Sequence, residues 1–272
     1  MAEHATFGLW RAVVSGFSTV GRRRPLVLLA WFLPALFALV GAIAVESELR
    51  AFFGASGLVD QLNGPIDLGA LEELAGGADG VAVTLRPVRL SPAAVFENLE
   101  ALVFASWTEL PRGLLALGAL YLLAWVFVQG GVVADLIARP NEFRLRVLLG
   151  DCSRYFPRML RLAALSALGY YAVYRFGRRL FPWVEGATKD VTSERLTLFL
   201  YLVAALCIVG LLACVHLVSD FARIALVGQG RRSSLLSVVS ALFQLLGHPL
   251  QVYGVAAVFA LLLFGLQVLY FW

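Results

Sequence analysis

The chain has 272 residues, of which 60% are hydrophobic and 15% charged, and its mean hydropathy is +0.83. This composition excludes a water-soluble globular domain, because one core of that size cannot hide so much apolar surface, whereas a bilayer accepts it. The net charge of +4 is modest and gives no reason to expect a nucleic-acid partner. The three cysteines do not suggest a disulfide framework, because Cys207 and Cys214 both fall inside an apolar run.

The first 24 residues predict an interfacial amphipathic helix, because apolar residues recur on one helical face between residues 7 and 24. Pro25 then opens an apolar run, and residues 25–45 are long enough to form a first membrane span. The arginines before this run and Ala42-Ile43-Ala44 after it also imitate a cleaved signal peptide. We favour an uncleaved anchor, because residues 26–45 are long enough to cross the bilayer.

Residues 46–112 form the predicted outer segment, which contains ten acidic residues and only four basic ones. Ser91-Pro92 is a typical helix start, with Ser as the cap and Pro in the first helical position. The apolar residues that follow recur at helical spacing. We expect this segment to place a helix on the outer face of the membrane.

Residues 113–272 predict a bundle of four further spans with two more elbow helices. The pattern of an amphipathic helix, a proline and an apolar run recurs at residues 143–156 before Pro157 and at residues 233–248 before Pro249. The predicted spans are residues 114–137, 158–176, 196–218 and 250–272. Residues 233–247 could insert as a sixth segment, but their length favours an interfacial helix. The predicted fold is therefore all-α, a polytopic transmembrane helical bundle of five spans, or six, with three amphipathic elbow helices on the cytoplasmic side.

Positive charge predicts the orientation of the chain. The predicted inner segments carry 13 basic residues and the outer segments 9, and three consecutive arginines precede the first span. The positive-inside rule then places the N-terminus in the cytoplasm and the C-terminus in the periplasm of a bacterial inner membrane. Small residues, Gly210 among them, mark places where helices could approach closely.

Two Asp–Arg pairs end the second and fourth predicted spans: Asp135 with Arg139, and Asp220 with Arg223. Both spacings allow contact on one helix. The favoured interpretation is a pair of interfacial ion pairs. The alternative is an ion or proton site shared by the two spans, since intramembrane acids often mark pathways.

His216 shares a helical face with Asp220 and Arg223, at spacings of four and three. A structural hydrogen bond to Asp220 is the favoured role, because the local ligands are too few for a metal site. A haem or chlorophyll on His216 is the weaker alternative, which nothing else in the sequence supports. No cofactor is therefore predicted, and no metal.

Arginines around the three elbow helices are predicted to contact anionic lipid headgroups, so bound lipid is expected. These residues are Arg22, Arg23, Arg24, Arg144, Arg154, Arg158, Arg161, Arg231 and Arg232.

Three short segments carry a resemblance to a known group of proteins: Phe127-Val-Gln-Gly-Gly131, Phe156-Pro-Arg-Met-Leu160 and Ser219-Asp-Phe-Ala-Arg223. With them the chain resembles uncharacterised bacterial multi-pass proteins related to the membrane domain attached to some glycerophosphodiester phosphodiesterases. The resemblance implies a polytopic helical fold and no catalytic residues, because the active site of those enzymes lies in a separate domain.

The sequence predicts a non-catalytic role. It contains no phosphate loop, no dinucleotide fingerprint and no CxxC motif, so an enzyme is not expected. The first hypothesis is a structural or accessory subunit of a larger inner-membrane complex, of respiratory or photosynthetic type, with membrane lipids and other integral membrane subunits as partners. The alternative is a small transporter or lipid-handling protein that uses a cleft between Asp135 and Asp220.

Overall fold

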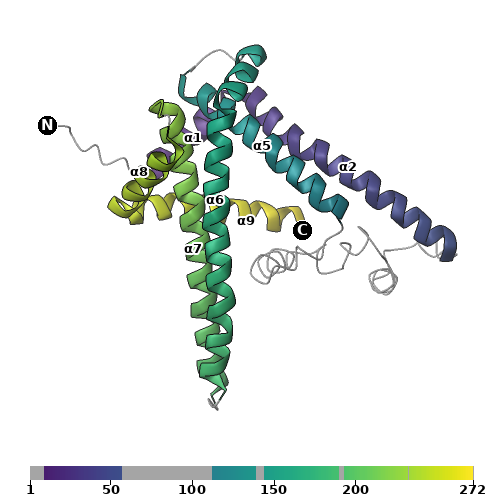
Figure 1. Ribbon diagram of the computed structural model, residues 1–272, viewed down its shortest axis with the longest axis vertical. Helices are drawn as coiled ribbons and strands as arrows, with labels where there is room; N and C mark the ends of the chain where they lie inside the picture. Colours follow the sequence, from purple (N-terminus) through teal and green to yellow (C-terminus); the bar gives the residue numbers. More distant parts are fainter. Residues whose placement is uncertain (1–8, 57–111, 139–143, 190–192, 232, 272) are drawn as a thin grey trace. The chain divides into compact units, whose positions relative to one another are not determined.

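A computed structural model describes residues 9–56, 112–138, 144–189, 193–231 and 233–271 (Figure 1). All regular structure in these ranges is α-helical, so the all-α prediction is confirmed. The helices are α1 (Leu9–Gly21), α2 (Arg24–Ser56), α5 (Arg112–Ala138), α6 (Leu145–Thr188), α7 (Glu194–Gly228), α8 (Ser234–Gly247) and α9 (Pro249–Phe271). The predicted helix after Ser91-Pro92 lies outside the described residues.

Three of these helices are long and apolar enough to cross a membrane: α2, α5 and α7. The helices α8 and α9 could form a fourth crossing if they are counted as one broken span, because they meet at a bend of 92°. The chain is thus a membrane protein by the length and composition of its helices, with fewer candidate spans than the five or six predicted. The third predicted span is missing from this set because α6 carries arginines along most of its length.

Two of the three predicted elbows are separate short helices. Helix α1 ends at Gly21, just before the arginine triplet, and α8 ends at Gly247, just before Pro249. The third predicted elbow is wrong, because α6 runs without a break through Pro157. Pro157 is exposed, so the carbonyl four residues earlier, which loses its N–H partner, can be satisfied from outside the helix.

Helix α6 also continues beyond residue 176, where the third predicted span ends, as far as Thr188. Its 44 residues correspond to about 66 Å, roughly twice the hydrocarbon thickness of a bilayer. The helix α7 returns alongside it, so the two form a long antiparallel hairpin (Figure 1). Contacts between Ser166 and Ser219 and between Tyr170 and His216 fix the register of this hairpin.

The chain forms two compact units. The first combines Met1–Val27 with Leu123–Leu262, and the second combines Leu28–Leu122 with Leu263–Trp272. The first unit contains the main core, in which α5, α6, α7 and α8 meet. Its buried apolar residues are Ala134, Met159, Leu162, Ala222, Leu226, Val227 and Ala241.

Close approach between α5 and α6 depends on two glycines. A Cβ atom on Gly131 would overlap Cys152 Sγ and lie 2.8 Å from the carbonyl oxygen of Leu148. A Cβ on Gly130 would lie 2.9 Å from Cβ of Tyr155. The structure shows no close packing at Gly210: among the described residues, no atom outside its own helix lies within 4 Å of a Cβ built there.

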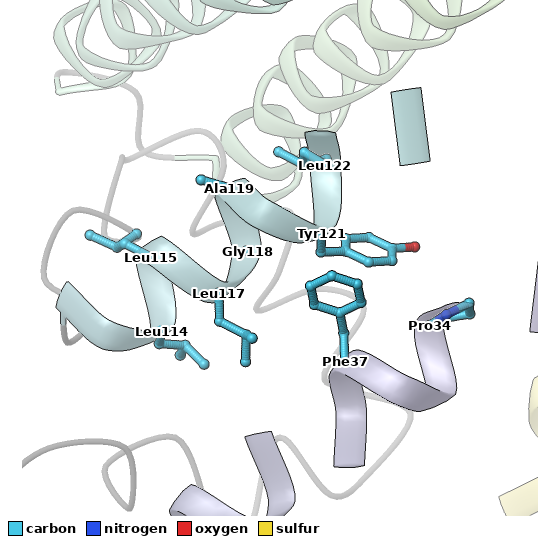
Figure 2. A pocket seen from close by; sticks show the side chains of 9 residues that line it. All are labelled: Pro34, Phe37, Leu114, Leu115, Leu117, Gly118, Ala119, Tyr121 and Leu122. Atoms are coloured by element: carbon cyan, nitrogen blue, oxygen red, sulfur yellow. The ribbon is translucent and has the colours of Figure 1, made fainter. Parts of the chain in front are cut away.

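In the second unit, α2 packs against the first half of α5. The rings of Phe37 and Tyr121 meet edge to face with centroids 5.4 Å apart. Beside them lies an open apolar groove of about 640 Å³, shown in Figure 2, with Pro34 and Leu117 among its lining residues. The groove has almost no polar lining, so it fits acyl chains or apolar side chains better than a charged solute.

Candidate polar sites in the membrane region

The buried ion pair of the first unit joins Arg23 to Asp135. The Arg23 side chain is 6% exposed and that of Asp135 is 1% exposed. Arg23 Nη1 donates to the carboxylate of Asp135 and also to its backbone carbonyl oxygen, at 2.8 Å. Arg23 lies between α1 and α2, and Asp135 lies near the end of α5, so the pair ties the α1–α2 junction to the second candidate span.

This pairing differs from the one that spacing predicts. Arg139, the predicted partner of Asp135, lies outside the described residues. Arg23 was expected to contact lipid headgroups, but its guanidinium is buried against Asp135 instead. Its neighbours Arg22 and Arg24 are exposed, as headgroup contacts require.

The second acid of the predicted site, Asp220, does pair within its own helix. Arg223 Nη1 donates to Asp220 Oδ1 at 2.6 Å. His216 Nε2 lies 3.4 Å from Asp220 Oδ2, and His216 Nδ1 lies 3.4 Å from the hydroxyl of Tyr170 on α6. These four side chains form a polar line across the hairpin, which we call the hairpin line.

The hairpin line is open to the surroundings, whereas Asp135 is enclosed. The His216 side chain is 62% exposed and that of Asp220 is 42% exposed. Within the described residues no hydrogen bond or ion pair joins Asp135 to Asp220; Asp135 pairs with Arg23, and Asp220 pairs with Arg223. In the same part of the chain, no three His, Cys, Asp or Glu side chains are placed to hold a metal ion.

The charge-free stretches of α6 and α7 lie at different levels of the hairpin, so that each lies partly opposite charged residues of the other helix. The longest stretch of α6 without a charged residue, residues 162–174, lies opposite the α7 segment that holds Asp220 and Arg223. The charge-free stretch of α7, residues 196–219, lies opposite the α6 segment that holds Arg175, Arg178 and Arg179. A hydrocarbon core of about 30 Å covers about 20 helical residues, so at any level it includes ionisable side chains of one helix or the other.

Spacing does not predict the exposed arginines of α6 as a site, because the predicted span ends at residue 176, next to Arg175 and before Arg178 and Arg179. A signal was available: Val173, Gly177, Val184 and Thr188 are spaced by four, seven and four, and the structure buries all of them. That spacing continues one helical face beyond the predicted end of the span. Arg175, Arg178 and Arg179 lie off this face and are exposed, and Arg178 donates to the Tyr174 hydroxyl at 3.2 Å.

The remaining predicted headgroup arginines are distributed over the first unit. Arg154 and Arg161 are exposed on α6, while Arg158 and Arg231 are partly buried. Arg144 precedes the first turn of α6 and is exposed, and Arg232 lies outside the described residues. Arg154 and Arg158 both lie over the ring of Tyr155, at 5.7 and 5.9 Å from its centroid.

Comparison of the chain with protein families, with curated proteins and with solved structures found no match. The function is therefore argued from the contacts and charges of the chain itself.

Proposed function

We propose that this protein is a non-catalytic accessory subunit of a larger membrane complex, and that the α6–α7 hairpin is its docking element. The membrane is the bacterial inner membrane, with the N-terminus in the cytoplasm and the C-terminus in the periplasm. In this arrangement α6 and α9 also cross, which gives five spans. The weak resemblance to the membrane domain of phosphodiesterases fits a helical subunit without catalytic residues.

One observation carries this proposal: exposed ionisable side chains lie beside the most apolar stretch of the hairpin. Arg175, Arg178 and Arg179 are exposed on α6 at the level of the charge-free stretch of α7. On insertion scales, a charged residue at the centre of a lone membrane helix costs about 2.5–3.5 kcal/mol. Long side chains near the ends of a span reduce that cost by reaching the interface. A placement that ends the core just before Arg175, however, brings Asp220 and Arg223 of α7 into the hydrocarbon.

A neighbouring subunit offsets this cost where lipid cannot. Acidic or carbonyl groups on a partner helix would accept hydrogen bonds from the guanidinium groups, and its apolar side chains would cover α7. Other polar side chains of the first unit bond within the chain. Ser166 and Ser219 form a hydrogen bond of 2.7 Å, and Ser234 donates to the carbonyl oxygen of Arg158. Those groups join helices within the chain. Arg178 donates instead to Tyr174 on its own helix, and its side chain remains exposed for a contact with another chain.

The test combines mild-detergent purification from the native membrane with site-specific photocrosslinking. A photoreactive amino acid at Arg178 is expected to capture the same subunit that co-purifies at a fixed stoichiometry. The control position is Phe243, which is exposed on α8 and is expected to capture lipid. A protein that purifies alone, with only lipid captured from position 178, would overturn the proposal.

A second function, transport of a proton or small solute, has a specific observation in its favour. Tyr170, His216 and Asp220 are linked at hydrogen-bonding or ion-pairing distances, and chains of such groups can move protons. If transport is the function, Asp220→Asn abolishes uptake in proteoliposomes while the assembled protein stays intact. If the accessory-subunit proposal holds, the same variant shows normal activity of the purified complex.

A further inference from the structure

We infer that the groove between α6 and the start of α8 binds one anionic phospholipid, with the phosphate at Arg161 and an acyl chain along Ala164, Leu165 and Leu168. This inference stands whether or not the protein is a subunit of a complex, because it concerns a groove within the first unit alone.

The groove has the two-part character of an amphiphile site. Its volume is about 550 Å³, within the range of small-ligand pockets. Its lining combines three polar residues, Arg161, Ser233 and Ser234, with four apolar ones, Ala164, Leu165, Leu168 and Leu235. A free anion would leave the apolar lining unused, and an uncharged lipid would leave Arg161 without a counter-charge.

The charge of the polar lining suits a phosphate. Arg161 is exposed, and none of the residues that line the groove is acidic. The Ser233 side chain caps α8 by accepting from the amide of Leu236, and Ser234 donates to the Arg158 carbonyl, so both hydroxyls are held in place. The positive end of the α8 dipole adds to the field of Arg161 at this point.

The hairpin register places the groove at the depth of a lipid headgroup. Ser166 lies opposite Ser219, so Arg161 lies about five residues further along α7, near Ile224 and close to the end of that candidate span. The residues at positions 164, 165 and 168 lie in the charge-free stretch of α6 that follows Arg161. A lipid bound in this way has its headgroup at the interface and its chain directed toward the hydrocarbon.

The experiment measures lipid retention by the full-length protein in detergent, by native mass spectrometry. The probes are phosphatidylglycerol and phosphatidylcholine of identical acyl composition. Arg161→Gln removes the charge, and Ala164→Trp fills the apolar part of the groove while leaving Arg161 in place. The matched control is Arg154→Gln, an exposed arginine on the same helix that does not line the groove.

The wild type and Arg154→Gln are expected to retain phosphatidylglycerol in preference to phosphatidylcholine. Arg161→Gln should lose about fivefold in apparent affinity, the effect of one well-placed basic residue, and Ala164→Trp should lose at least as much. Three results would overturn the inference: retention by Arg161→Gln equal to that of the control, equal retention of both lipids, or displacement of the lipid by millimolar inorganic phosphate, which would identify a simple anion site.

Discussion

At the scale of single residues, the three consecutive arginines before the first span occupy two different environments. Arg22 and Arg24 are exposed, whereas Arg23 turns inward and is enclosed with Asp135. Oδ1 of Asp135 is buried without a hydrogen-bond partner among the described residues. The carboxylate therefore depends on Arg23 for its neutralisation, and the α1–α2 junction depends on the pair for its position.

Arg23→Gln is expected to lower the free energy of unfolding by about 3–5 kcal/mol, because it leaves a buried carboxylate without its counter-charge. Arg22→Gln, one position earlier and exposed, should change it by less than about 0.5 kcal/mol. Unfolding by SDS from mixed micelles measures both. Equal stability of the two variants would show that the buried pair does not hold the junction.

Gly131→Ala should destabilise the protein by about 1–3 kcal/mol, because the new methyl group has to displace α5 from Cys152 and the Leu148 carbonyl. The matched control is Gly210→Ala, where the added Cβ meets no other helix within 4 Å in the described part of the chain. There the better helix propensity of alanine should raise stability by up to about 1 kcal/mol. Thermal unfolding in detergent should give shifts of opposite sign for the two variants.

At the scale of whole helices, the register of α6 against α7 supports both proposals and can be tested directly. Ser166→Cys with Ser219→Cys should form a disulfide under mild oxidation, because the two hydroxyl oxygens lie 2.7 Å apart across the hairpin. The background has the three native cysteines replaced by Ala. In the control, Ser166→Cys is combined with Cys207, which is kept in that variant alone and lies about 18 Å from Ser219 along α7. Cross-linking of the control pair alone would overturn the register.

The sequence predicts helices well wherever the signal is local. The boundaries of α5, α8 and α9 follow the apolar runs and Pro249 to within a few residues. It fails at α6, where Pro157 and the charges from Arg175 onward predict interruptions, although one buried face runs past both. Arg23 and Asp135 could not have been matched by spacing, because 112 residues separate them and only the fold brings them together.

At the scale of the whole molecule, the number of crossings decides where the C-terminus lies. The predicted orientation with five spans places Trp272 in the periplasm, so alkaline phosphatase fused after it should be active and a fluorescent protein fused before Met1 should be fluorescent. Three crossings would give the same result. If α8 and α9 form one broken span and α6 does not cross, the C-terminal phosphatase would be inactive, and the five-span proposal would fail.

The charge content of α6 also bears on how the protein is made. The ribosome completes α6 about 40 residues before the end of α7, which corresponds to about 2–8 s of synthesis. During that interval the arginines of α6 have no apolar helix beside them. We therefore expect α6 to insert only after α7 has been synthesised. A chain truncated after Thr188 should therefore leave α6 accessible to protease in a cell-free translation with membranes, whereas a chain that extends to Gly228 should protect it.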